Sequence, residues 1–471
     1  MYDIIIIGSG IIGSMLAYDL SRFNVSVCVL EKNVEIMNEV SSSNSGLVHA
    51  GYDPEDGTLK KRLNLVGARR YPKIASDLNV DYEQVGSLLV SNSLDDHNAL
   101  LNYAERAKER DIEFKYIQQD EIRKIEPNIS DSVLEALFFP TTAIITPWQM
   151  GFACMNYAVL NGVKLFRETK VLGIEKDNTY KVITNNGVFE SKCVVNCSGL
   201  NGVVVAKYDN PDTTHQIEFR KGEYQVSDTR DASYLNHIIY PMPSKLGKGV
   251  LALKTIEGNL MFGPTSNVIE NGYDFSTTSS GLKEIDSKIS QIIKPLPKNR
   301  MIRQFAGVRP SSLSKDFIIE DHQGFINVIG IDSPGLASAP GISEYVIQSF
   351  IQNYFDLDNK SNLVDFKWKK HLSFEERNNL IKDDSRYGRI VCVCETISEK
   401  EIMNAIHLPV GARSIKGVKR LTRPGSGRCQ GGFCESEVVR ILARELKVDM
   451  KDIPYDNDVF LTPLGGNDET H

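Results

Sequence analysis

Four cysteines near the C-terminal end have the spacing of metal ligands. Cys392 and Cys394 form a C-x-C pair, and Cys429 and Cys434 follow as a C-x4-C pair after 34 further residues. Thiolates bind soft metals, and four of them hold either a tetrahedral zinc ion or a [2Fe–2S] cluster. Because structural zinc sites usually leave about two to four residues between paired cysteines, the single-residue gap is unusual for zinc. A cluster, a zinc ion and unligated redox-active thiols are the three interpretations of this spacing.

The N-terminal residues predict a nucleotide-binding unit. Residues 2–7 form an apolar run typical of a buried parallel strand, a helical pattern covers residues 14–22, and a second apolar strand over residues 25–30 ends at Glu31. A G-x-G-x-x-G sequence joins the first strand to the helix, and its glycines are Gly8, Gly10 and Gly13. Such glycines permit a tight turn and close approach of the backbone to a pyrophosphate, and Glu31 is placed to accept hydrogen bonds from a ribose. A glycine-rich turn without a ligand is the alternative.

Three later segments favour FAD over NAD as the dinucleotide. Residues 41–46 form a small polar loop suited to a flavin, and the strand predicted over residues 192–197 ends in a small-residue turn. The strand predicted over residues 325–330 leads to a helix predicted over residues 342–354. The N-terminus of that helix would stabilise negative charge on a reduced flavin. No second glycine fingerprint for a nicotinamide cofactor is visible in the sequence.

Five stretches carry a family resemblance: SNSGLVHAGYDPEDGTLKKRLNLVGARRY, RKGEYQV, GKGVLALKTIEGNLMFGPTSN, FAGVRPSSLSKDFIIED and DSPGLASAPGISE. Together they resemble the branch of the D-amino-acid-oxidase-like flavoproteins that contains mycoplasma-type glycerol-3-phosphate oxidases and L-2-hydroxyglutarate dehydrogenases. The resemblance extends over roughly the first three quarters of the chain, in the same order. It implies oxidation of a C–H bond beside a hydroxyl group, with the hydride passing to the flavin and the hydroxyl proton to a base.

The FAD-binding residues expected from these motifs come from several segments of the chain. They are Gly8, Gly10, Ile12, Gly13, Glu31, Lys32, Ser43, Asn44, Ser45, Gly46, Val171, Ser198, Gly199, Gly307, Gly335 and Leu336.

Three candidate catalytic residues follow from the resemblance and from side-chain chemistry, namely His49, Lys248 and Arg309. His49, just past the flavin loop, is the expected base, because the pKa of histidine lies near working pH. A structural histidine in the core is the alternative. Lys248 stands between two glycines that would let it approach a ligand, and the resemblance makes it a substrate contact. A solvated hairpin lysine is the alternative.

Arg309 and Ser333 complete the expected substrate site. A guanidinium group forms paired hydrogen bonds with phosphate or carboxylate, and so Arg309 is the expected anion clamp, unless it forms a structural ion pair. Ser333 either donates to the same anion or caps a helix. Lys248 and Arg309 together suit a doubly charged phosphate ester, although they suit one end of a dicarboxylate as well.

The C-terminal segment carries a second resemblance. Residues 392–396 and 422–434 resemble the bacterioferritin-associated-ferredoxin-like [2Fe–2S] domain, which also stands at the tail of anaerobic-type glycerol-3-phosphate dehydrogenase subunits. The resemblance implies a small helical domain with the four cysteines as cluster ligands. Basic residues accompany them, either as a positive rim around the cluster or as a solvated face: Lys416, Lys419, Arg420, Arg423 and Arg428.

Length and composition limit the class of protein. A chain of 471 residues suggests two or three domains. The formal net charge of -7 does not suggest a nucleic-acid-binding protein. No uninterrupted apolar run is long enough to span a bilayer, and no basic region typical of a signal peptide precedes the first apolar run. These features predict a cytoplasmic protein, with peripheral contact at the inner membrane face left open.

The expected fold class is α/β, with three domains. A Rossmann-type FAD-binding domain is interleaved with a mainly antiparallel β substrate domain, and a linker leads to a small helical [2Fe–2S] domain. The expected ranges are 1–81, 148–205 and 301–355 for the first domain, 82–147 and 206–300 for the second, 356–386 for the linker and 387–465 for the last.

The sequence therefore predicts an FAD-dependent dehydrogenase with sn-glycerol 3-phosphate as the preferred substrate and dihydroxyacetone phosphate as the product. Electrons would leave through the cluster to an external acceptor, such as a partner protein or a quinone-linked subunit. L-2-hydroxyglutarate is the alternative substrate. A second alternative is a non-catalytic electron-transfer subunit of a larger complex.

Overall fold

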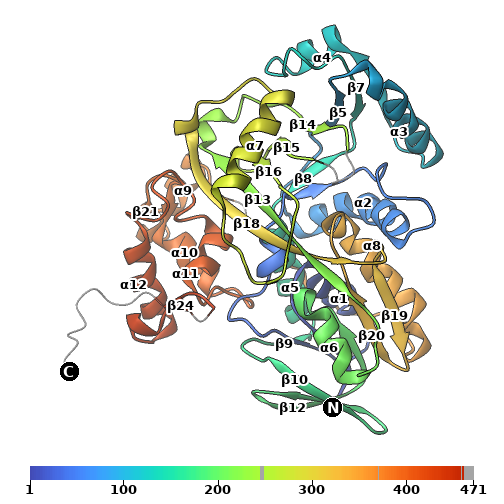
Figure 1. Ribbon diagram of the computed structural model, residues 1–471. Coiled ribbons are helices and arrows are strands. Elements are labelled where there is room, and N and C mark those ends of the chain that lie inside the picture. Colours follow the sequence, from blue (N-terminus) through green and yellow to red (C-terminus); the bar gives the residue numbers. More distant parts are fainter. Residues whose placement is uncertain (244–248, 370, 458, 461–471) are drawn as a thin grey trace, which may run out of the picture.

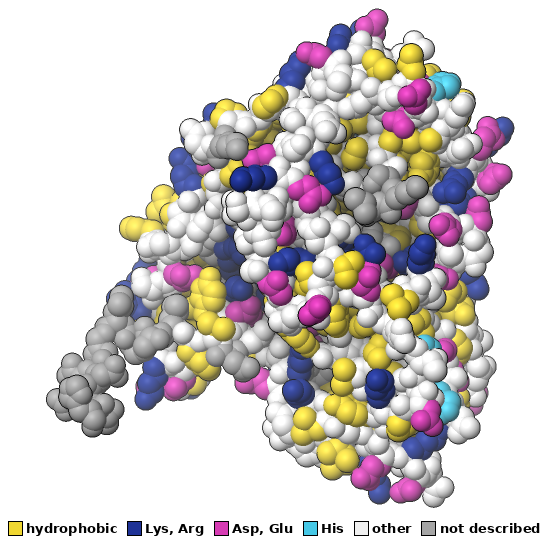
Figure 2. Space-filling view, in the orientation of Figure 1, with side chains coloured by type: hydrophobic (Ala, Val, Ile, Leu, Met, Phe, Trp, Pro, Cys, Tyr) yellow, Lys and Arg dark blue, Asp and Glu magenta, His cyan; other side chains and the backbone are white. Residues whose placement is uncertain are grey.

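The computed structural model describes residues 1–460 except 244–248, 370 and 458 (Figure 1), and so Lys248 lies outside the described residues. Two large sheets and a helical C-terminal unit make up the molecule. Positive and negative side chains are interspersed over the face that Figure 2 shows. No helix in the described part of the chain combines the length and the apolar character that crossing a membrane requires.

The first sheet has eight strands and a parallel centre. Strand β1 (Tyr2–Ile7) lies between β12 (Gly187–Asn196) and β2 (Val27–Leu30), and all three run parallel. The predicted strand pattern is confirmed here, because the central isoleucines of β1 are fully buried. The remaining strands are β9 (Lys164–Phe166), β10 (Val171–Lys176), β11 (Tyr180–Thr184), β19 (Ile318–His322) and β20 (Phe325–Ile329).

Helices pack around this sheet, and one of them differs from the prediction. They are α1 (Ile11–Leu20), α2 (Leu59–Leu78), α5 (Pro147–Leu160), α6 (Gly202–Asp209) and α8 (Gly335–Ser349). The helix expected over residues 342–354 is α8, and the prediction was wrong at both ends. Pro340 cannot donate to the carbonyl of Leu336, but the hydroxyl of Tyr71 on α2 donates to that oxygen at 2.6 Å. A tertiary hydrogen bond therefore replaces the one that proline removes.

The second sheet has nine strands and is antiparallel except where β5 pairs with β14. In order from one edge its path is β17 (Asn267–Ile269), β13 (Ile217–Ser227), β16 (Leu260–Gly263), β15 (Leu251–Lys254), β14 (Ile238–Pro241), β5 (Ser87–Ser91), β7 (Glu135–Phe139) and β6 (Lys115–Gln118). Helices α3 (His97–Glu109), α4 (Gln119–Ile125) and α7 (Ser279–Ile292) pack beside it. A small third sheet joins β3 (Leu47–Val48), β8 (Ala143–Ile145) and β4 (Tyr82–Glu83).

Strand β18 (Met301–Ser312) belongs to the second sheet. It pairs with β13 from Ile217 to Ser227, whereas the sequence assigned residues 301–312 to the FAD-binding domain. Its buried residues, such as Ala306 and Val308, carry no signal for which sheet receives them. The long strand thereby brings its central residues from the second sheet to the edge of the first.

The C-terminal unit contains α10 (Glu399–Ile406), α11 (Ile415–Thr422) and α12 (Glu435–Leu446). Two short hairpins accompany these helices, β21 (Ile390–Cys392) with β22 (Ile397–Ser398) and β23 (Pro454–Asp456) with β24 (Val459–Phe460). Figure 1 shows the unit in orange and red beside the second sheet. The expected linker contains α9 (Phe374–Leu380), whose buried Arg377 pairs with Glu401 of α10 at 3.1 Å. That part of the linker is therefore packed on the unit.

Candidate active site and metal centre

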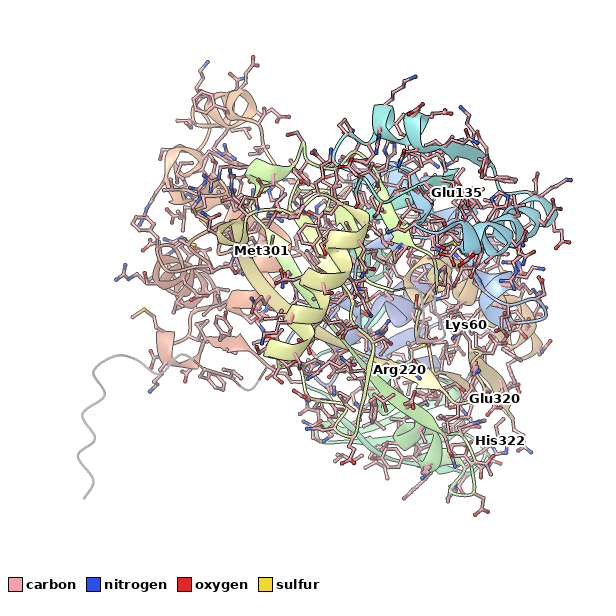
Figure 3. The ribbon with its side chains drawn as sticks, turned by 45° about the horizontal axis from the view of Figure 1, so that its top comes forward. Lys60, Glu135, Arg220, Met301, Glu320 and His322 are labelled. Carbon is pink, nitrogen blue, oxygen red and sulfur yellow. The ribbon has the colours of Figure 1, made fainter. Side chains whose placement is uncertain are left out.

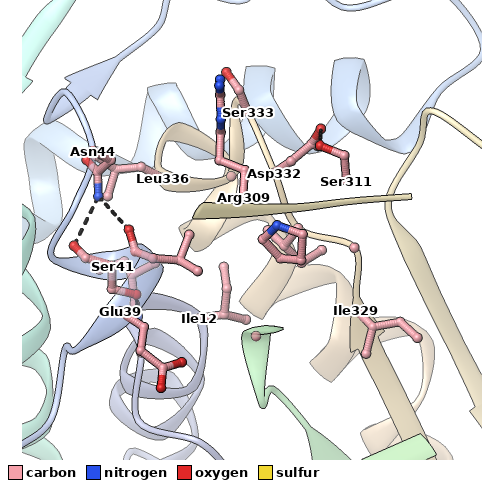
Figure 4. Close-up of a pocket in the computed structure, with 18 of the residues that line it drawn as sticks. Ile12, Glu39, Ser41, Asn44, Arg309, Ser311, Ile329, Asp332, Ser333 and Leu336 are labelled. Atoms are coloured by element: carbon pink, nitrogen blue, oxygen red, sulfur yellow. Dashed lines mark hydrogen bonds between the residues drawn. The ribbon is translucent and has the colours of Figure 1, made fainter. Parts of the chain in front are cut away.

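A cavity of about 880 Å³ lies where the two sheets meet, within the size range of small-molecule and cofactor sites. Its walls come from the turn after β1, residues 38–45, the turn after β12, strand β18 and the start of α8 (Figure 4). Most of the predicted FAD-binding and substrate residues line it: Gly8, Gly10, Ile12, Glu31, Lys32, Asn44, Ser45, His49, Val171, Ser198, Gly199, Arg309, Ser333, Gly335 and Leu336. The other predicted residues in the described part, Gly13, Ser43, Gly46 and Gly307, do not line it.

The glycine turn is shaped as a dinucleotide cradle. Gly8 has a φ of +98°, and a Cβ there would lie 2.6 Å from the carbonyl oxygen of Cys197. A Cβ on Gly13 would lie 2.0 Å from the carbonyl oxygen of Gly8. Only glycine fits either position, and the space over the start of α1 stays open to a ligand. The turn therefore has the form that a bound pyrophosphate requires.

Glu31 ties the glycine turn to the end of β2. Its Oε2 accepts hydrogen bonds from the backbone N–H and the hydroxyl of Ser9 at 2.9 and 2.7 Å, and its Oε1 accepts from the Asn33 N–H at 2.9 Å. Burial raises the pKa of this carboxyl group, against the lowering effect of these hydrogen bonds. A carboxylate offers about four acceptor sites, so one stays available for a ribose hydroxyl. Glu31 therefore fits the predicted cofactor contact and also organises the turn.

Residues 39–45 form the wall beside the expected flavin. Asn44 Nδ2 donates to the carbonyl oxygens of Val40 and Ser41 at 3.2 and 3.0 Å, the two bonds drawn in Figure 4. From outside, β18 touches this loop so closely that a Cβ on Gly307 would lie 2.1 Å from the carbonyl oxygen of Ser43. Gly307 therefore supports the wall without lining the cavity.

We expect Gly307→Ala to weaken FAD binding. The added methyl group must displace the backbone of Ser43, and overpacking of this kind costs about 1–3 kcal/mol, which corresponds to roughly 5- to 150-fold in affinity. FAD content per chain after gel filtration, with the dissociation constant from flavin fluorescence, measures the effect. Gly173→Ala is the matched control, because its Cβ would meet nothing closer than Ile183 Cδ1 at 3.8 Å. Equal FAD affinity in both variants would contradict the expected steric role.

His49 is buried in a ring of aromatic side chains. Its ring centroid lies 4.6 Å from that of Tyr52 and 5.7 Å from that of Tyr240. Nδ1 accepts a hydrogen bond from the Gly51 N–H at 3.1 Å. A neutral ring with this acceptor carries its proton on Nε2, so Nδ1 is its basic nitrogen. To act as the predicted base, His49 must therefore release the hydrogen bond between Nδ1 and the Gly51 N–H and take up a proton at Nδ1.

Arg309 lines the cavity and has no carboxylate partner among the residues that the structure describes. One of its guanidinium nitrogens donates to the carbonyl oxygen of Thr265 at 3.0 Å. By contrast, Arg220 (labelled in Figure 3), directly across from Arg309 on β13, pairs with Glu218 at 2.7 Å. The alternative of a structural ion pair for Arg309 is thus not supported, and the guanidinium suits an anionic ligand.

Ser333 lies at the turn before α8, where Pro334 is the N-cap residue. No side chain caps this helix, so the alternative of Ser333 as a helix cap is not supported. The hydroxyl group is left to the cavity wall, where a ligand can meet it.

The cavity also contains residues that the sequence analysis missed. Lys60 on α2 pairs with Asp332 at 2.6 Å, and Ser311 donates to the same carboxylate at 2.9 Å. The phenol oxygen of Tyr240 is buried and has no hydrogen-bond partner within the described residues. Lys60 is one of three consecutive basic residues, and Tyr240 continues an apolar strand, so neither carried a distinguishing signal.

The four C-terminal cysteines form two pairs. The sulfur atoms of Cys394 and Cys429 lie 3.8 Å apart, and both residues are exposed. Cys392 and Cys434 are buried, and a hydrogen bond from Cys434 lowers the pKa of Cys392 to about 6. Within the described chain, no three metal-binding side chains gather at one point. Two sulfur atoms on one tetrahedral metal, at about 2.3 Å from it, would be about 3.8 Å apart. Two thiol pairs fit a cluster that takes two cysteines at each iron.

The basic residues near these cysteines mostly face inward. Lys416 pairs with Asp456, Arg420 contacts Asn38, and Arg423 pairs with Glu395. Lys419 donates to the carbonyl oxygen of Gly425 at 2.6 Å. Arg428 alone of the five has an exposed side chain, and it pairs with Asp228 of the second sheet at 3.2 Å. Neither a positive rim nor a solvated face describes the set, because four of its members hold parts of the fold together.

Comparisons with known proteins agree with this geometry. The family model described as FAD dependent oxidoreductase matches residues 3–349, and the model of the BFD-like [2Fe-2S] binding domain matches residues 390–444. A glycerol 3-phosphate dehydrogenase of Caloramator mitchellensis is 40% identical over 97% of both chains. An L-2-hydroxyglutarate dehydrogenase of Escherichia coli is 25% identical over 74% of this chain and 92% of its own. The solved L-alpha-glycerophosphate oxidase of Mycoplasma pneumoniae, with FAD bound, superposes with a TM-score of 0.74 at 25% identity, covering 79% of this chain and 99% of its own.

Proposed function

The chain belongs to the family of FAD dependent oxidoreductases, and from this premise we propose that it oxidises sn-glycerol 3-phosphate to dihydroxyacetone phosphate. Its C-terminal unit is a BFD-like [2Fe-2S] binding domain, through which we propose that electrons leave for an external acceptor. The observation that carries the proposal is Arg309, a guanidinium group in the cofactor cavity that has only a backbone carbonyl as its partner in the described chain. The similarity to a glycerol 3-phosphate dehydrogenase along nearly the whole chain supports phosphate as its ligand.

Each residue of the site has a proposed role in this reaction. Arg309 binds the phosphate group, and Ser333 donates to the same anion. Lys248, outside the described residues, assists as a second positive charge. His49 takes the hydroxyl proton at Nδ1 in exchange for the Gly51 hydrogen bond. Bound FAD supplies a two-electron acceptor, and the cluster carries one electron at a time.

The cofactor contacts are proposed from the same geometry. The turn of Gly8, Gly10 and Gly13 receives the pyrophosphate, Glu31 a ribose, and residues 43–46 and the start of α8 the flavin. Cys392 with Cys434 and Cys394 with Cys429 hold the two irons. In the proposed domain division, the first sheet and its helices bind FAD, the second sheet forms the substrate side, and the unit after residue 386 binds the cluster.

The second candidate substrate is L-2-hydroxyglutarate. The relative from Escherichia coli favours it, and a carboxylate also fits the paired donors of Arg309. A dicarboxylate needs a second positive group at its far end. The ion pair of Arg220 with Glu218 makes that neighbouring cation unavailable in the present arrangement, which favours the phosphate ester.

Anaerobic bleaching of the flavin separates these substrates. We expect sn-glycerol 3-phosphate to bleach FAD-loaded protein in the absence of oxygen, whereas glycerol, which has the same carbon skeleton without the anion, leaves it oxidised at the same concentration. Bleaching by L-2-hydroxyglutarate alone would replace the proposed substrate with the second candidate. An oxidised spectrum with every hydroxy acid and phosphate ester tested would support a non-catalytic subunit instead.

A further inference from the structure

A short segment that follows strand β2 of the first sheet contacts both the cofactor cavity and the C-terminal unit. It runs from Glu35 to Ser45, a few residues after the end of β2 at Leu30. Asn38, Glu39, Ser41 and Asn44 of this segment line the cavity. The C-terminal unit touches the same segment at two places, Glu35 and Asn38.

Glu35 is a fully buried carboxylate that binds the start of helix α11. Its Oε1 accepts hydrogen bonds from the backbone N–H groups of Arg413 and Ser414 at 2.7 and 2.8 Å, and from the Ser414 hydroxyl at 2.9 Å. The N-terminal end of a helix is the favourable end for a negative charge. Oε2 pairs with Arg167 at 3.3 Å, and Arg167 also donates to the carbonyl oxygen of Gly411 at 3.0 Å. The carboxylate thus joins residues far apart in the sequence into one fixed contact.

Helix α11 approaches Glu35 as closely as the chain allows. Its Gly417 has no side chain, and a Cβ there would lie 1.9 Å from Oε1 of Glu35. The Ser414 hydroxyl that donates to Glu35 also accepts from the Gly417 N–H at 2.8 Å. Any residue larger than glycine would move the helix away from the carboxylate.

The same helix reaches the cysteines at its other end. Arg420 donates to the side-chain oxygen of Asn38, which lines the cavity. Lys419 donates to the carbonyl oxygen of Gly425 at 2.6 Å. Gly425 belongs to the loop between α11 and α12, which carries Cys429 and Cys434. Contacts of α11 therefore connect the wall of the FAD cavity to the cysteine-bearing loop.

We propose that Glu35 is a positioning residue that fixes helix α11, and with it the cysteine-bearing loop, against the wall of the FAD cavity and so sets the rate of electron transfer from flavin to cluster. The proposal rests on the proposed function, because it requires both cofactors to act in one chain. Electron transfer rates fall steeply with distance. A fixed contact between α11 and the wall of the cavity therefore keeps electron transfer within the chain fast. Other contacts hold the unit in place when Glu35 is altered, such as Val410 N–H to Asn156 at 2.8 Å and Arg428 to Asp228 at 3.2 Å. Loss of Glu35 is therefore expected to loosen the contact between α11 and the cavity wall without detaching the C-terminal unit.

Rapid anaerobic mixing tests the proposal in two variants that loosen the same contact differently. Glu35→Ala removes the carboxylate, and Gly417→Ala places a methyl group against it. In both variants, we expect sn-glycerol 3-phosphate to bleach the flavin at an unchanged rate. We expect reduction of the cluster, which freeze-quench EPR monitors, to be about tenfold slower or more. Glu35→Gln keeps the Oε1 acceptor and is expected to restore most of the rate. Iron and acid-labile sulfide per chain establish that each variant compared carries a full cluster.

Two control variants match these changes. Glu135→Ala removes another buried glutamate, which pairs with His97 at 2.8 Å in the part of the second sheet far from the C-terminal unit (Figures 1 and 3). Gly173→Ala adds a methyl group where there is room for it. Both are expected to reduce the cluster at the rate of the unaltered protein.

The outcomes separate this proposal from the proposed function. Cluster reduction at the unaltered rate in both Glu35→Ala and Gly417→Ala would overturn the positioning role. If Glu35→Ala does not retain its cluster, Gly417→Ala decides by the same comparison. If sn-glycerol 3-phosphate does not bleach even the unaltered protein, the proposed function fails. The flavin is then reduced photochemically, and a slowed flavin-to-cluster step in the same variants still supports Glu35.

Discussion

Arg309→Ala is expected to lower kcat/KM for sn-glycerol 3-phosphate by roughly 30- to 5,000-fold. The guanidinium group of Arg309, on β18, is the cation proposed to bind the substrate anion in the cavity. Loss of one partner of a buried charged hydrogen bond costs about 2–5 kcal/mol. Steady-state kinetics with an artificial electron acceptor measures the effect. FAD content is expected to stay unchanged, because the side chain is proposed to bind substrate rather than cofactor.

Two comparisons make the Arg309 result specific. Arg309→Lys keeps the charge but loses the paired donors, and we expect it to fall between the alanine variant and the unaltered protein. The effect of alanine should appear with the phosphate ester and vanish with an uncharged diol used at high concentration. An alanine variant with unchanged kcat/KM for sn-glycerol 3-phosphate would show that the anion binds elsewhere.

Cys392→Ser is expected to remove the cluster while leaving the flavin reaction intact. Cys392 is buried and receives a hydrogen bond from Cys434, so a hydroxyl group there cannot replace a thiolate ligand. Loss of a direct ligand should weaken the cluster at least as much as outer-shell changes weaken metal sites, about 10- to 100-fold. We expect little iron and sulfide in the purified variant, and normal bleaching of its flavin by substrate. The rate of electron delivery to one-electron acceptors should fall by a factor similar to the loss of cluster.

Cys28→Ser provides the matched control for that experiment. Cys28 is another buried thiol, in strand β2, and burial raises its pKa to about 12, so it is an unreactive core residue. Its variant should keep iron and sulfide at the unaltered level. Iron and sulfide at full content in Cys392→Ser would contradict the ligand assignment, and zinc without sulfide in the unaltered protein would contradict the cluster.

The local features of the fold were predictable from the sequence. The turn between β1 and α1 depends on neighbouring residues, namely an apolar strand, three glycines and an acid at the end of the next strand. Those patterns record local conformation and burial directly. The family resemblance added the expected cofactors, which the family models confirm.

Features that depend on distant partners were not predictable. The early start of α8 depends on a hydroxyl group from Tyr71, and the sheet that receives β18 depends on its pairing with β13. The side chains of Arg420 and Arg423 point inward because they contact Asn38 and Glu395, respectively. A single sequence shows that such residues are charged or apolar, but it does not show which partner each one meets.

The same limit applies to the candidate site. Residue type and the family stretch around it identified Arg309, but the lack of an internal carboxylate partner is visible only in the folded chain, among the residues that the structure describes. For His49 the sequence suggested a base, and the structure adds that its Nδ1 is engaged by Gly51. Lys60 and Asp332 come together at the cavity from positions 272 residues apart, the difference of their numbers, and the family stretches that contain them do not show that the two side chains meet.

A single anaerobic experiment on the FAD-loaded protein with a full cluster tests the proposed electron path most directly. Sn-glycerol 3-phosphate is added without any other electron source, and the flavin absorbance and the EPR spectrum are recorded on the same sample. We expect loss of the oxidised flavin spectrum followed by the signal of a reduced [2Fe–2S] cluster. A flavin that stays oxidised, or a flavin that is bleached while the cluster stays EPR-silent, would contradict electron transfer from substrate through flavin to cluster.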